Sequence, residues 1–364
     1  MSATPYRADQ VGSLLRPLEL LEARARLGPS SPELRELEDA AIRAALERQR
    51  AIEIDVLVDG EFRRGAWQTD MAAAVDGFVA DNVAMGWYGK DDVIEGSSAQ
   101  VVGAKLRPRG RLAEHESSFL SANAGGPFKV TLPSPSVFMI MSYKPGVTDR
   151  FYPTRKKLLD ELTRIVRDEV EALVAEGVPY IQLDAPQYSY YFDDALRETL
   201  RSEGVEPDAA LADAVAADNS CLADLGGATV TTGLHICRGN RRSMWFAQGG
   251  YEPIAEKLFA TCAANRLLLE YDSDRAGGFE PLRFVPDDTH VVLGLLSSKV
   301  GSPEPRDEIL RRIDEASRYH SVDRLALSPQ CGFASNAAGN ALDPQQQWAK
   351  LEQVVAIARE VWPD

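Results

Sequence analysis

A histidine and a cysteine two positions apart, His235 and Cys237, are the first residues whose types and spacing suggest chemistry. They lie in residues 231–240, which begin with β-branched and apolar residues and end in Gly and Asn. This pattern predicts a strand that breaks into a loop. Side chains two positions apart on an extended strand point to the same side, so the imidazole and the thiol share one face. Taken alone, such a pair is more often buried or incidental than functional.

Two later residues extend this pair into a candidate metal site. Glu270 follows an apolar run of three leucines, and Cys331 follows another short segment of buried-strand character. One histidine, two cysteines and one glutamate, delivered by three strand ends, fit a tetrahedral zinc ion. We therefore expect His235, Cys237, Glu270 and Cys331 to bind zinc. The alternative is a closed zinc site that only stabilises the fold, although structural sites usually draw on local Cys-x-x-Cys pairs.

A zinc ion with these four ligands predicts chemistry at sulfur. Two thiolates, a neutral imidazole and a carboxylate give the centre a formal charge of about −1. Such a centre is a poor Lewis acid for water, but it favours the deprotonated form of a bound thiol, whose free pKa is about 8.5. Glu270 is the weakest of the four ligands for sulfur, so we expect a substrate thiol to displace it. The resulting thiolate would be the nucleophile of an alkyl transfer.

Two carboxylates, Glu61 and Asp184, form a second candidate group. Each lies at the end of a short apolar segment, so both are expected on the same face of the fold. Together they could hold the ammonium group of an amino-acid substrate, and we assign them a catalytic role in orienting it. In the alternative, Glu61 pairs with Arg63 or Arg64 and orders a loop. Basic residues that could meet a carboxylate, a sulfonate or a polyglutamate tail are Arg16, Arg107, Arg238 and Lys299.

The elements that must position these side chains alternate between short apolar runs and segments of helical periodicity. The expected strands are residues 11–15, 54–58, 128–132, 178–184, 228–234, 266–270, 290–295 and 324–327. The expected helices include residues 32–52, 154–176, 252–264, 306–319 and 344–362. This alternation is typical of a (β/α)8 TIM barrel, which belongs to the α/β class. We expect residues 1–364 to form one such catalytic domain.

Two longer stretches, residues 66–126 and 188–226, interrupt the alternation after the second and fourth strands. We expect both to be helical excursions, the first of them covering one mouth of the barrel. The polar candidates all lie at or just past the C-terminal ends of expected strands, where such barrels place their active sites. They are Ser13, Glu61, Asp184, His235, Cys237, Glu270, Lys299 and Cys331. A doubly wound sheet would instead gather its site at one switch point.

Composition limits the classes of function. With 364 residues, 45% of them hydrophobic and 26% charged, the chain can bury the core of an ordinary soluble protein. A net charge of −15 argues against a nucleic-acid surface and against binding to an anionic membrane. No apolar run approaches the ~20 residues that span a bilayer. The first seven residues have no apolar core of a signal peptide, so we expect a cytoplasmic protein.

Cysteine usage agrees with that compartment. The four cysteines are few and scattered, which suits free thiols or metal ligands rather than disulfides. We expect Cys221 and Cys262 to be structural. The expected partners are a small-molecule thiol and a methyl donor, and the sequence does not decide between a monomer and a homo-oligomer.

These residues resemble the cobalamin-independent methionine synthase family, in particular its zinc-bearing C-terminal barrel, and the resemblance runs over nearly the whole chain. The matching motifs are Val11-Gly12-Ser13, Asp59-Gly60-Glu61, Ile181-Gln182-Leu183-Asp184, His235-Ile236-Cys237, Glu270 and Pro329-Gln330-Cys331-Gly332. The resemblance implies a (β/α)8 barrel and a zinc ion that activates homocysteine for methylation. It also places Ser13, Glu61 and Asp184 around the amino-acid end of homocysteine, as substrate-binding residues.

The sequence departs from the family in three places. It lacks the N-terminal half that helps the large two-barrel members to bind the folate polyglutamate. The family's Asp-Ile-His-Ser-Pro segment, whose histidine donates a proton, reads Gly-Leu-Leu-Ser-Ser at residues 294–298. The tryptophan that stacks on the folate falls near residues 141–143, where this chain has none. The chain is therefore most similar to the short, single-barrel members.

The leading hypothesis is a zinc-dependent methyltransferase that activates homocysteine, or a similar thiol, as a zinc thiolate for S-methylation. The alternative keeps zinc and changes the electrophile, giving a thiol–alkyl transferase or lyase that is similar to the epoxyalkane:coenzyme M transferases. A third reading, a zinc-dependent thiol sensor, would bind thiols without turnover.

Overall fold

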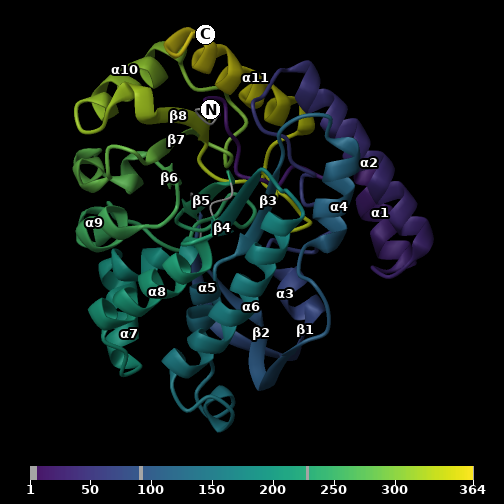
Figure 1. The fold of residues 1–364 in the computed structure, drawn as a ribbon, viewed down its shortest axis with the longest axis vertical. Coiled ribbons are helices and arrows are strands. Elements are labelled where there is room, and N and C mark those ends of the chain that lie inside the picture. Colours follow the sequence, from purple (N-terminus) through teal and green to yellow (C-terminus); the bar gives the residue numbers. More distant parts are fainter. Residues whose placement is uncertain (1–5, 90–92, 227–228, 364) are drawn as a thin grey trace.

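The computed structural model describes residues 6–89, 93–226 and 229–363, and its centre is a sheet of six parallel strands (Figure 1). Each strand pairs with the next one along the chain. The strands are β3 (Lys129–Pro133), β4 (Tyr180–Asp184), β5 (Thr231–Ile236), β6 (Arg266–Glu270), β7 (His290–Leu296) and β8 (Leu325–Pro329). The register sets Asp184 beside His235 and Glu270 beside Gly294. These strands agree with the predicted ones to within a few residues, although the predicted start of the fifth, residue 228, lies outside the described residues.

Two further segments continue the sheet at its edges. Ala8 pairs with Leu327 of β8, and Leu57 pairs with Phe128, the residue before β3. A backbone hydrogen bond of 3.2 Å from the Asp55 amide to the Ala8 carbonyl joins the two segments to each other. Backbone pairing thus runs from β8 through these segments to β3, in agreement with the predicted α/β class.

The first two strands differ in detail from the prediction. Residues 11–15, expected as a strand, form a loop, and residues 54–58 make only a single bridge. One physical reason is that a side chain forms hydrogen bonds to backbone groups that would otherwise pair with a neighbouring strand. The side-chain carboxamide of Gln49 accepts a hydrogen bond of 2.9 Å from the backbone N–H of Val58 and donates one of 2.8 Å to the backbone carbonyl of Val58.

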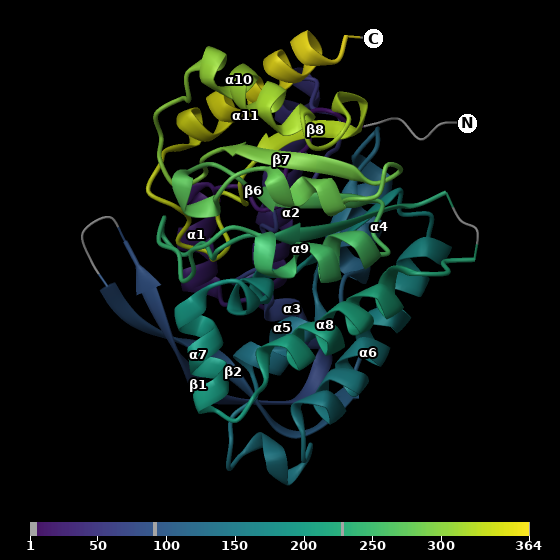
Figure 2. The ribbon, with the colours of Figure 1, turned by 90° about the vertical axis from the view of Figure 1, so that its left-hand side faces the viewer.

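Helices cover the outside of the sheet, as Figures 1 and 2 show from two directions. The long ones begin at polar N-caps: Ser31 caps α2, Thr154 caps α6, and Asp343 forms a capping box at α11. The α-helices are α1 (Leu18–Leu27), α2 (Pro32–Ala51), α3 (Thr69–Ala74), α4 (Glu114–Asn123), α5 (Pro135–Met141), α6 (Arg155–Ala175), α7 (Asp194–Ser202), α8 (Pro207–Leu222), α9 (Glu252–Leu258), α10 (Arg306–Ser317) and α11 (Pro344–Val361). The 3-10 helices are η1 (Thr148–Arg150), η2 (Pro186–Tyr191), η3 (Phe259–Thr261), η4 (Asp274–Ala276), η5 (Glu280–Phe284) and η6 (Val322–Arg324).

The helix predicted over residues 252–264 is shorter than expected. It continues as the 3-10 turn η3, and Cys262 then adopts an extended backbone. The Asn219 side chain of α8 holds this end, because it donates to the Thr261 carbonyl (2.7 Å) and accepts from the Ala263 amide (2.8 Å). Cys262 packs against the core and Cys221 is buried in α8, in agreement with the structural roles predicted for both.

The first excursion is not the helical insertion that we predicted. Between α3 and α4 it forms a long antiparallel hairpin of β1 (Val75–Tyr88) and β2 (Val93–Pro108), which projects from the body in Figure 2. The sequence of β1 is rich in valine and aromatic residues, and buried and exposed positions mix along it, as in a strand with two partly covered faces. Tyr88 pairs with Trp245 through two backbone hydrogen bonds, so the hairpin also contacts the loop that follows β5.

The second excursion is helical as predicted, and consists of η2, α7 and α8. Its buried Asp218 joins it to the turn after β3. The Asp218 carboxylate accepts hydrogen bonds from the hydroxyls of Ser134 (2.7 Å) and Tyr188 (2.9 Å). Among the described helices, none has both the length and the apolar character needed to span a bilayer.

Candidate metal and substrate site

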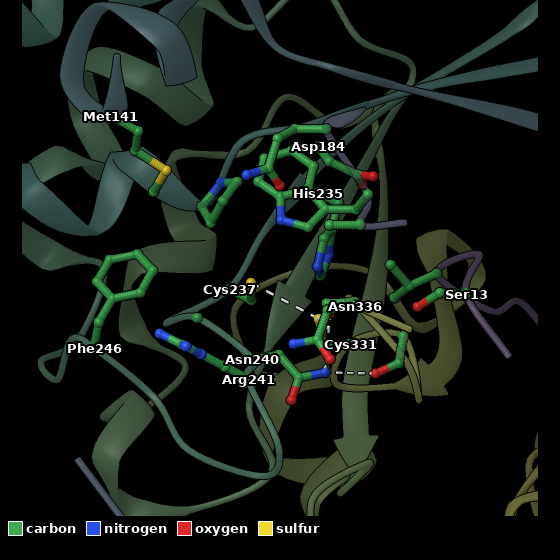
Figure 3. Close-up of a pocket in the computed structure, with 18 of the residues that line it drawn as sticks. Ser13, Met141, Asp184, His235, Cys237, Asn240, Arg241, Phe246, Cys331 and Asn336 are labelled. Carbon is green, nitrogen blue, oxygen red and sulfur yellow. Dashed lines mark hydrogen bonds between the residues drawn. The ribbon is translucent and has the colours of Figure 1, made fainter. Parts of the chain in front are cut away.

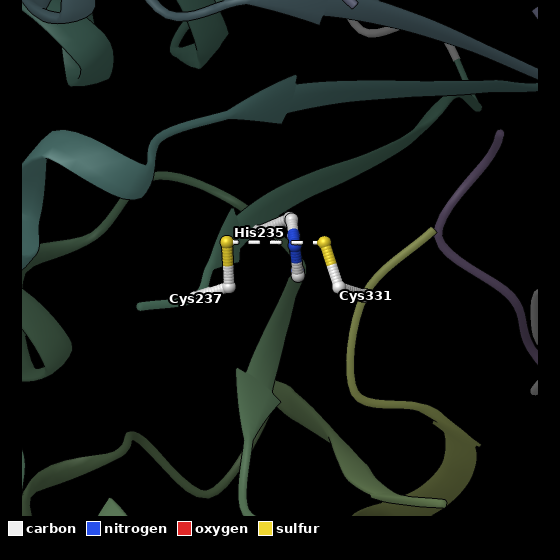
Figure 4. Close-up of side chains that lie close together, drawn as sticks. All are labelled: His235, Cys237 and Cys331. Carbon is white, nitrogen blue, oxygen red and sulfur yellow. Dashed lines mark hydrogen bonds between the residues drawn. The ribbon is translucent and has the colours of Figure 1, made fainter. Parts of the chain in front are cut away.

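Three of the four predicted metal ligands meet at the C-terminal ends of the strands. His235 lies near the end of β5, Cys237 directly follows β5, and Cys331 follows β8 by two residues. One potential ligand atom from each side chain lies within 4.8 Å of the other two (Figure 4). The three residues are between 2% and 5% exposed. Strand pairing therefore brings together residues that are almost a hundred positions apart in the chain.

The geometry of this cluster fits a zinc ion. The two sulfur atoms are 3.9 Å apart, and a tetrahedral ion with Zn–S bonds of about 2.3 Å would separate them by about 3.8 Å. Both cysteines are free thiols. Neither ring nitrogen of the buried His235 has a hydrogen-bond partner among the described residues. An unsatisfied imidazole between two thiols is costly unless it binds something, so the donor set suits a metal.

The fourth predicted ligand, Glu270, lies next to the cluster of His235, Cys237 and Cys331 but is not part of it. One carboxylate oxygen accepts from the Arg275 guanidinium at 2.9 Å, and the other accepts from the Arg238 amide at 2.7 Å. Burial favours the neutral acid, but the charges of Lys299, Arg238 and Arg275 outweigh it and lower the pKa of Glu270 to about 2. A charged carboxylate is therefore present beside the cluster, and its role as a zinc ligand remains a prediction.

The electrostatic environment of the two cysteines separates their pKa values. The hydrogen bond between the Cys331 and Cys237 thiols, together with His235 and Lys299, lowers the pKa of Cys331 well below its usual range despite burial. The pKa of Cys237 is raised by the same contact and by burial. The Lys299 ammonium is buried and has no hydrogen-bond partner among the described residues. Its positive charge lowers the pKa of both Cys331 and Glu270.

The predicted anion-binding residues are used elsewhere. Arg16 donates to the backbone carbonyls of Glu61 and Arg64, and Arg238 donates to those of Gly249 and Glu270. Arg107 is an exposed residue of β2, and the charge of Lys299 lowers the pKa of Cys331. None of the four lines the cavity described below.

The predicted substrate-binding residues, Ser13, Glu61 and Asp184, line one cavity together with His235, Cys237 and Cys331 (Figure 3). Asp184 is the last residue of β4, and its carboxylate accepts a hydrogen bond of 2.7 Å from Gln182. Burial raises its pKa even though His235 and this hydrogen bond oppose the shift. The Ser13 hydroxyl accepts a hydrogen bond from the amide of Ala334, which lies in the loop that carries Cys331 (3.3 Å).

Glu61 is held in an unusual conformation at the wall of this cavity. Its φ of 58° is in the left-handed region that residues other than glycine rarely adopt, and such residues occur often at functional sites. One carboxylate oxygen accepts from the Thr131 hydroxyl at 3.1 Å, and the other has no partner among the described residues. Burial raises the pKa of Glu61 to about 8, although Arg64 opposes the shift. The alternative pairing with Arg64 is thus present at 3.6 Å, but it leaves one oxygen free.

The cavity has a volume of about 270 Å³ and is also lined by Trp67, Met85, Trp87, Met141, Phe246 and Arg241. Met141 and Phe246 lie on the opposite side of the two cysteines from Ser13 (Figure 3), and Trp87 packs against Phe246, so we call this side the aromatic half. Sequence reasoning missed these residues, because Met85 and Trp87 come from the hairpin that was expected to be helical. The high content of valine and aromatic residues in β1 was the signal that a strand could carry Trp87 to the site.

Comparisons with known proteins agree with this geometry. The sequence profile described as "Cobalamin-independent synthase, Catalytic domain" matches residues 20–360. The chain belongs to this family. It is 38% identical to a Bacillus subtilis protein named uncharacterized protein YxjH, over 98% of this chain and 95% of that one. It is also 26% identical to a methionine synthase of Thermococcus kodakarensis, over 81% of this chain and 76% of that protein.

A solved structure supports the same assignment. The putative vitamin-B12-independent methionine synthase of Listeria monocytogenes is 27% identical, with a TM-score of 0.75, and the match covers the whole of both chains. The cobalamin-independent synthase family is therefore shown for this chain, and the resemblance stated from the motifs is confirmed. At the level of the family, the protein is a methyltransferase.

Two departures from the family have a structural counterpart. The position of the family's proton-donating histidine is occupied by Leu296, which is fully buried in β7. Of the four histidines in the sequence, only His235 lines the cavity. No tryptophan occurs at residues 141–143, but Met141 lines the cavity, and Trp67 and Trp87 supply its indole rings from other segments.

Proposed function

We propose that this protein is a zinc-dependent methyltransferase that binds homocysteine, or a similar thiol, for S-methylation. The observation that carries the proposal is the cluster of His235, Cys237 and Cys331 at one wall of a cavity that also contains Glu61 and Asp184. A zinc ion held by these residues would favour the deprotonated form of a substrate thiol. We propose Glu270 as the fourth ligand before a thiol binds, since it is charged and adjacent.

We propose that the two buried carboxylates, Glu61 and Asp184, bind the amino-acid end of the substrate. One Glu61 oxygen has no hydrogen-bond partner among the described residues, and Asp184 lines the same cavity. An ammonium group between them would have two carboxylate partners in a site from which water is largely excluded. It would also favour the ionised form of Glu61, whose pKa of about 8 leaves it largely protonated at neutral pH without substrate. We therefore infer that an α-amino thiol displaces the proton that Glu61 holds.

Ser13 and the loop after Cys331 complete this end of the site. Gly332 lies against Ser13 so closely that a Cβ at this position would overlap the Ser13 hydroxyl. The two loops therefore hold one another in place beside Cys331. We assign Ser13, Glu61 and Asp184 to binding and orientation of the thiol substrate.

A second candidate is a zinc-dependent thiol–alkyl transferase or lyase that uses a non-folate electrophile. It is favoured by Leu296, because this buried apolar side chain cannot protonate a leaving group as the family's histidine does. Such an enzyme would share the thiol half of the site and differ in the second substrate.

An assay of methionine formation tests the proposal and separates the candidates. Homocysteine is incubated with the zinc-loaded protein and, separately, with methyltetrahydrofolate, methylcobalamin and non-folate donors. We expect methylation from at least one donor, and loss of activity after zinc is chelated. Transfer from the folate alone would reject the second candidate. Tight thiol binding without turnover from any donor would reject both and support a thiol sensor.

A further inference from the structure

Two series of buried hydrogen bonds lead to the carboxylates in the polar half of the cavity, Glu61 and Asp184. The Thr131 hydroxyl donates to Oε1 of Glu61 at 3.1 Å, and the Gln182 carboxamide donates to Oδ1 of Asp184 at 2.7 Å. Thr131 and Gln182 are partners in the register of β3 and β4, so both donors lie at the same level of the sheet. Both are buried, and neither lines the cavity. A bound substrate would therefore contact the carboxylates but not these donors.

The first series begins at the buried guanidinium of Arg64. Glu116 and Asp70 form ion pairs with this guanidinium and balance its charge. Arg64 also donates a hydrogen bond of 3.1 Å to the Thr131 hydroxyl. A guanidinium can only donate, so the Thr131 oxygen accepts from Arg64 and directs its own single proton to Glu61. The series thus runs from Arg64 through Thr131 to Glu61, with the direction of each hydrogen bond fixed.

The second series begins at the buried ammonium group of Lys129. It pairs with the Asp9 carboxylate at 2.7 Å and donates a hydrogen bond of 2.9 Å to the carboxamide oxygen of Gln182. An ammonium can also only donate, so the carboxamide oxygen faces Lys129 and the NH2 group faces Asp184. The same NH2 group donates to the Val11 carbonyl at 2.9 Å. The second series thus has the same order as the first: a cation, a neutral side chain and a carboxylate of the cavity.

Each series takes up one oxygen of a carboxylate and leaves the other for a ligand. Oε2 of Glu61 has no hydrogen-bond partner among the described residues. A donor on the first oxygen restricts the rotation of the carboxylate and favours its charged form. Both effects suit an ammonium group, which binds most strongly to ionised acceptors that are already held in position.

We propose that Thr131 and Gln182 are positioning residues that orient Glu61 and Asp184 as paired acceptors, and so give the site its selectivity for thiols that carry an amino group. This inference rests on the proposed function, in which the two carboxylates bind the ammonium group of the thiol substrate. The two buried cations act one step further away, because they fix the direction in which Thr131 and Gln182 donate.

The preference for an amino thiol tests the inference. Dissociation constants of homocysteine and of 3-mercaptopropionate, which lacks the amino group, are measured by calorimetry on zinc-loaded wild type and variants. Thr131→Val keeps the shape of the side chain and removes the hydroxyl, so the preference for homocysteine should fall on the order of tenfold. Gln182→Met should have a similar effect through Asp184. Zinc content and the affinity for 3-mercaptopropionate should stay the same in both variants, which a general loss of folding would not allow.

Two further variants locate the effect. Thr131→Ser restores a hydroxyl and should recover most of the preference. Thr232→Val is the matched control and should keep the wild-type preference, because Thr232 is a buried threonine of β5 whose hydroxyl donates to Asn265. An unchanged preference in Thr131→Val or in Gln182→Met, equal weakening of both thiols, no recovery in Thr131→Ser, or an equal loss in Thr232→Val would overturn the inference.

The wild type separates this inference from the proposed function. A wild-type preference for homocysteine that survives the substitutions overturns the positioning role alone. A wild type that binds the two thiols equally, or binds neither, overturns the amino-acid site of the proposed function together with the inference that rests on it.

Discussion

The two halves of the cavity are built from different parts of the molecule. The polar half consists of residues at the ends of barrel strands and in the loops directly after them, such as Asp184 on β4 and His235 on β5. Strand register fixes these two residues side by side. The aromatic half is supplied largely by segments outside the sheet, among them the β1 hairpin with Trp87 and the loop with Arg241 and Phe246.

This difference separates two tasks. Activation of a thiol needs several charged or ligating groups in fixed positions, and strand ends of a rigid sheet supply them. Under the proposed function, the aromatic half contacts the second substrate, and insertions can change its shape without disturbing the barrel. Members of one family can therefore share the polar half and differ in the aromatic half.

The largest effect that we expect concerns the polar half. Asp184→Asn keeps the shape of the side chain and removes its charge, so an ammonium would lose one of its two carboxylate partners. Loss of one partner of a buried pair costs about 3–5 kcal/mol, which is on the order of a hundredfold or more in affinity. Homocysteine binding, measured by calorimetry, should weaken by this amount at unchanged zinc content.

The control for Asp184→Asn is a thiol without the amino group. Binding of 3-mercaptopropionate should be nearly indifferent to the substitution. If both thiols weaken equally, or if homocysteine affinity is unchanged, the amino-acid reading of the polar half is wrong.

A smaller effect is expected from the aromatic half. Trp87→Leu removes a ring that packs on Phe246 and carries Arg241 over its face. Aromatic contacts of this kind contribute about 0.5–1.5 kcal/mol each, so the Michaelis constant for the donor should rise roughly threefold to tenfold. Homocysteine affinity should stay the same. Trp348→Leu on α11, which does not line the cavity, is the control, and an equal loss of donor binding in it would contradict the division into halves.

Proton release on binding should distinguish the halves further. Burial raises the pKa of Glu61 to about 8, so at pH 7 the free enzyme holds a proton there. An ammonium beside Glu61 lowers that pKa, and homocysteine should then release up to about one more proton from the wild type than from Glu61→Gln. Calorimetry in buffers of different ionisation enthalpy measures the difference. It should vanish above about pH 9, where Glu61 is already ionised, and a difference that persists there would contradict the assignment.

The smallest effect concerns the Asp218 network that joins the second excursion to the turn after β3. Burial raises the pKa of Asp218 from 3.8 to about 7 despite its hydroxyl donors. The folded state therefore binds a proton that the unfolded state has lost, so stability should fall as the pH rises from about 4 to 7. Asp218→Asn should flatten this decline, by about a few degrees in melting temperature between pH 5 and pH 8. An unchanged pH dependence would show that Asp218 does not titrate in this range.

The sequence predicted the polar half better than the aromatic half, for a physical reason. His235, Cys237 and Cys331 could be placed because each follows a short apolar run, and parallel strand ends must meet at one edge of the barrel. The place of Trp87 depends on a hairpin whose contact with Trp245 joins segments more than 150 residues apart, and no local pattern encodes that contact.

The errors in the predicted positions of the first two strands have a similar cause. The first strand was placed at residues 11–15 on its apolar composition, but the pairing residue is Ala8. The second became a single bridge at Leu57, next to backbone groups that the Gln49 side chain takes up. Hydrogen bonds between a helix side chain and a strand backbone are tertiary contacts, so propensity and periodicity do not report them.

The central claim, a zinc site formed by His235, Cys237 and Cys331, is tested most directly by metal analysis of purified protein after dialysis against a weak chelator. We predict about one zinc ion per chain in the wild type, and little or none in Cys237→Ser and Cys331→Ser. Cys262→Ser, which changes a cysteine outside the cluster, should keep its zinc and shows that a lost thiol alone is not the cause. Full zinc occupancy in both Cys237→Ser and Cys331→Ser would contradict the account.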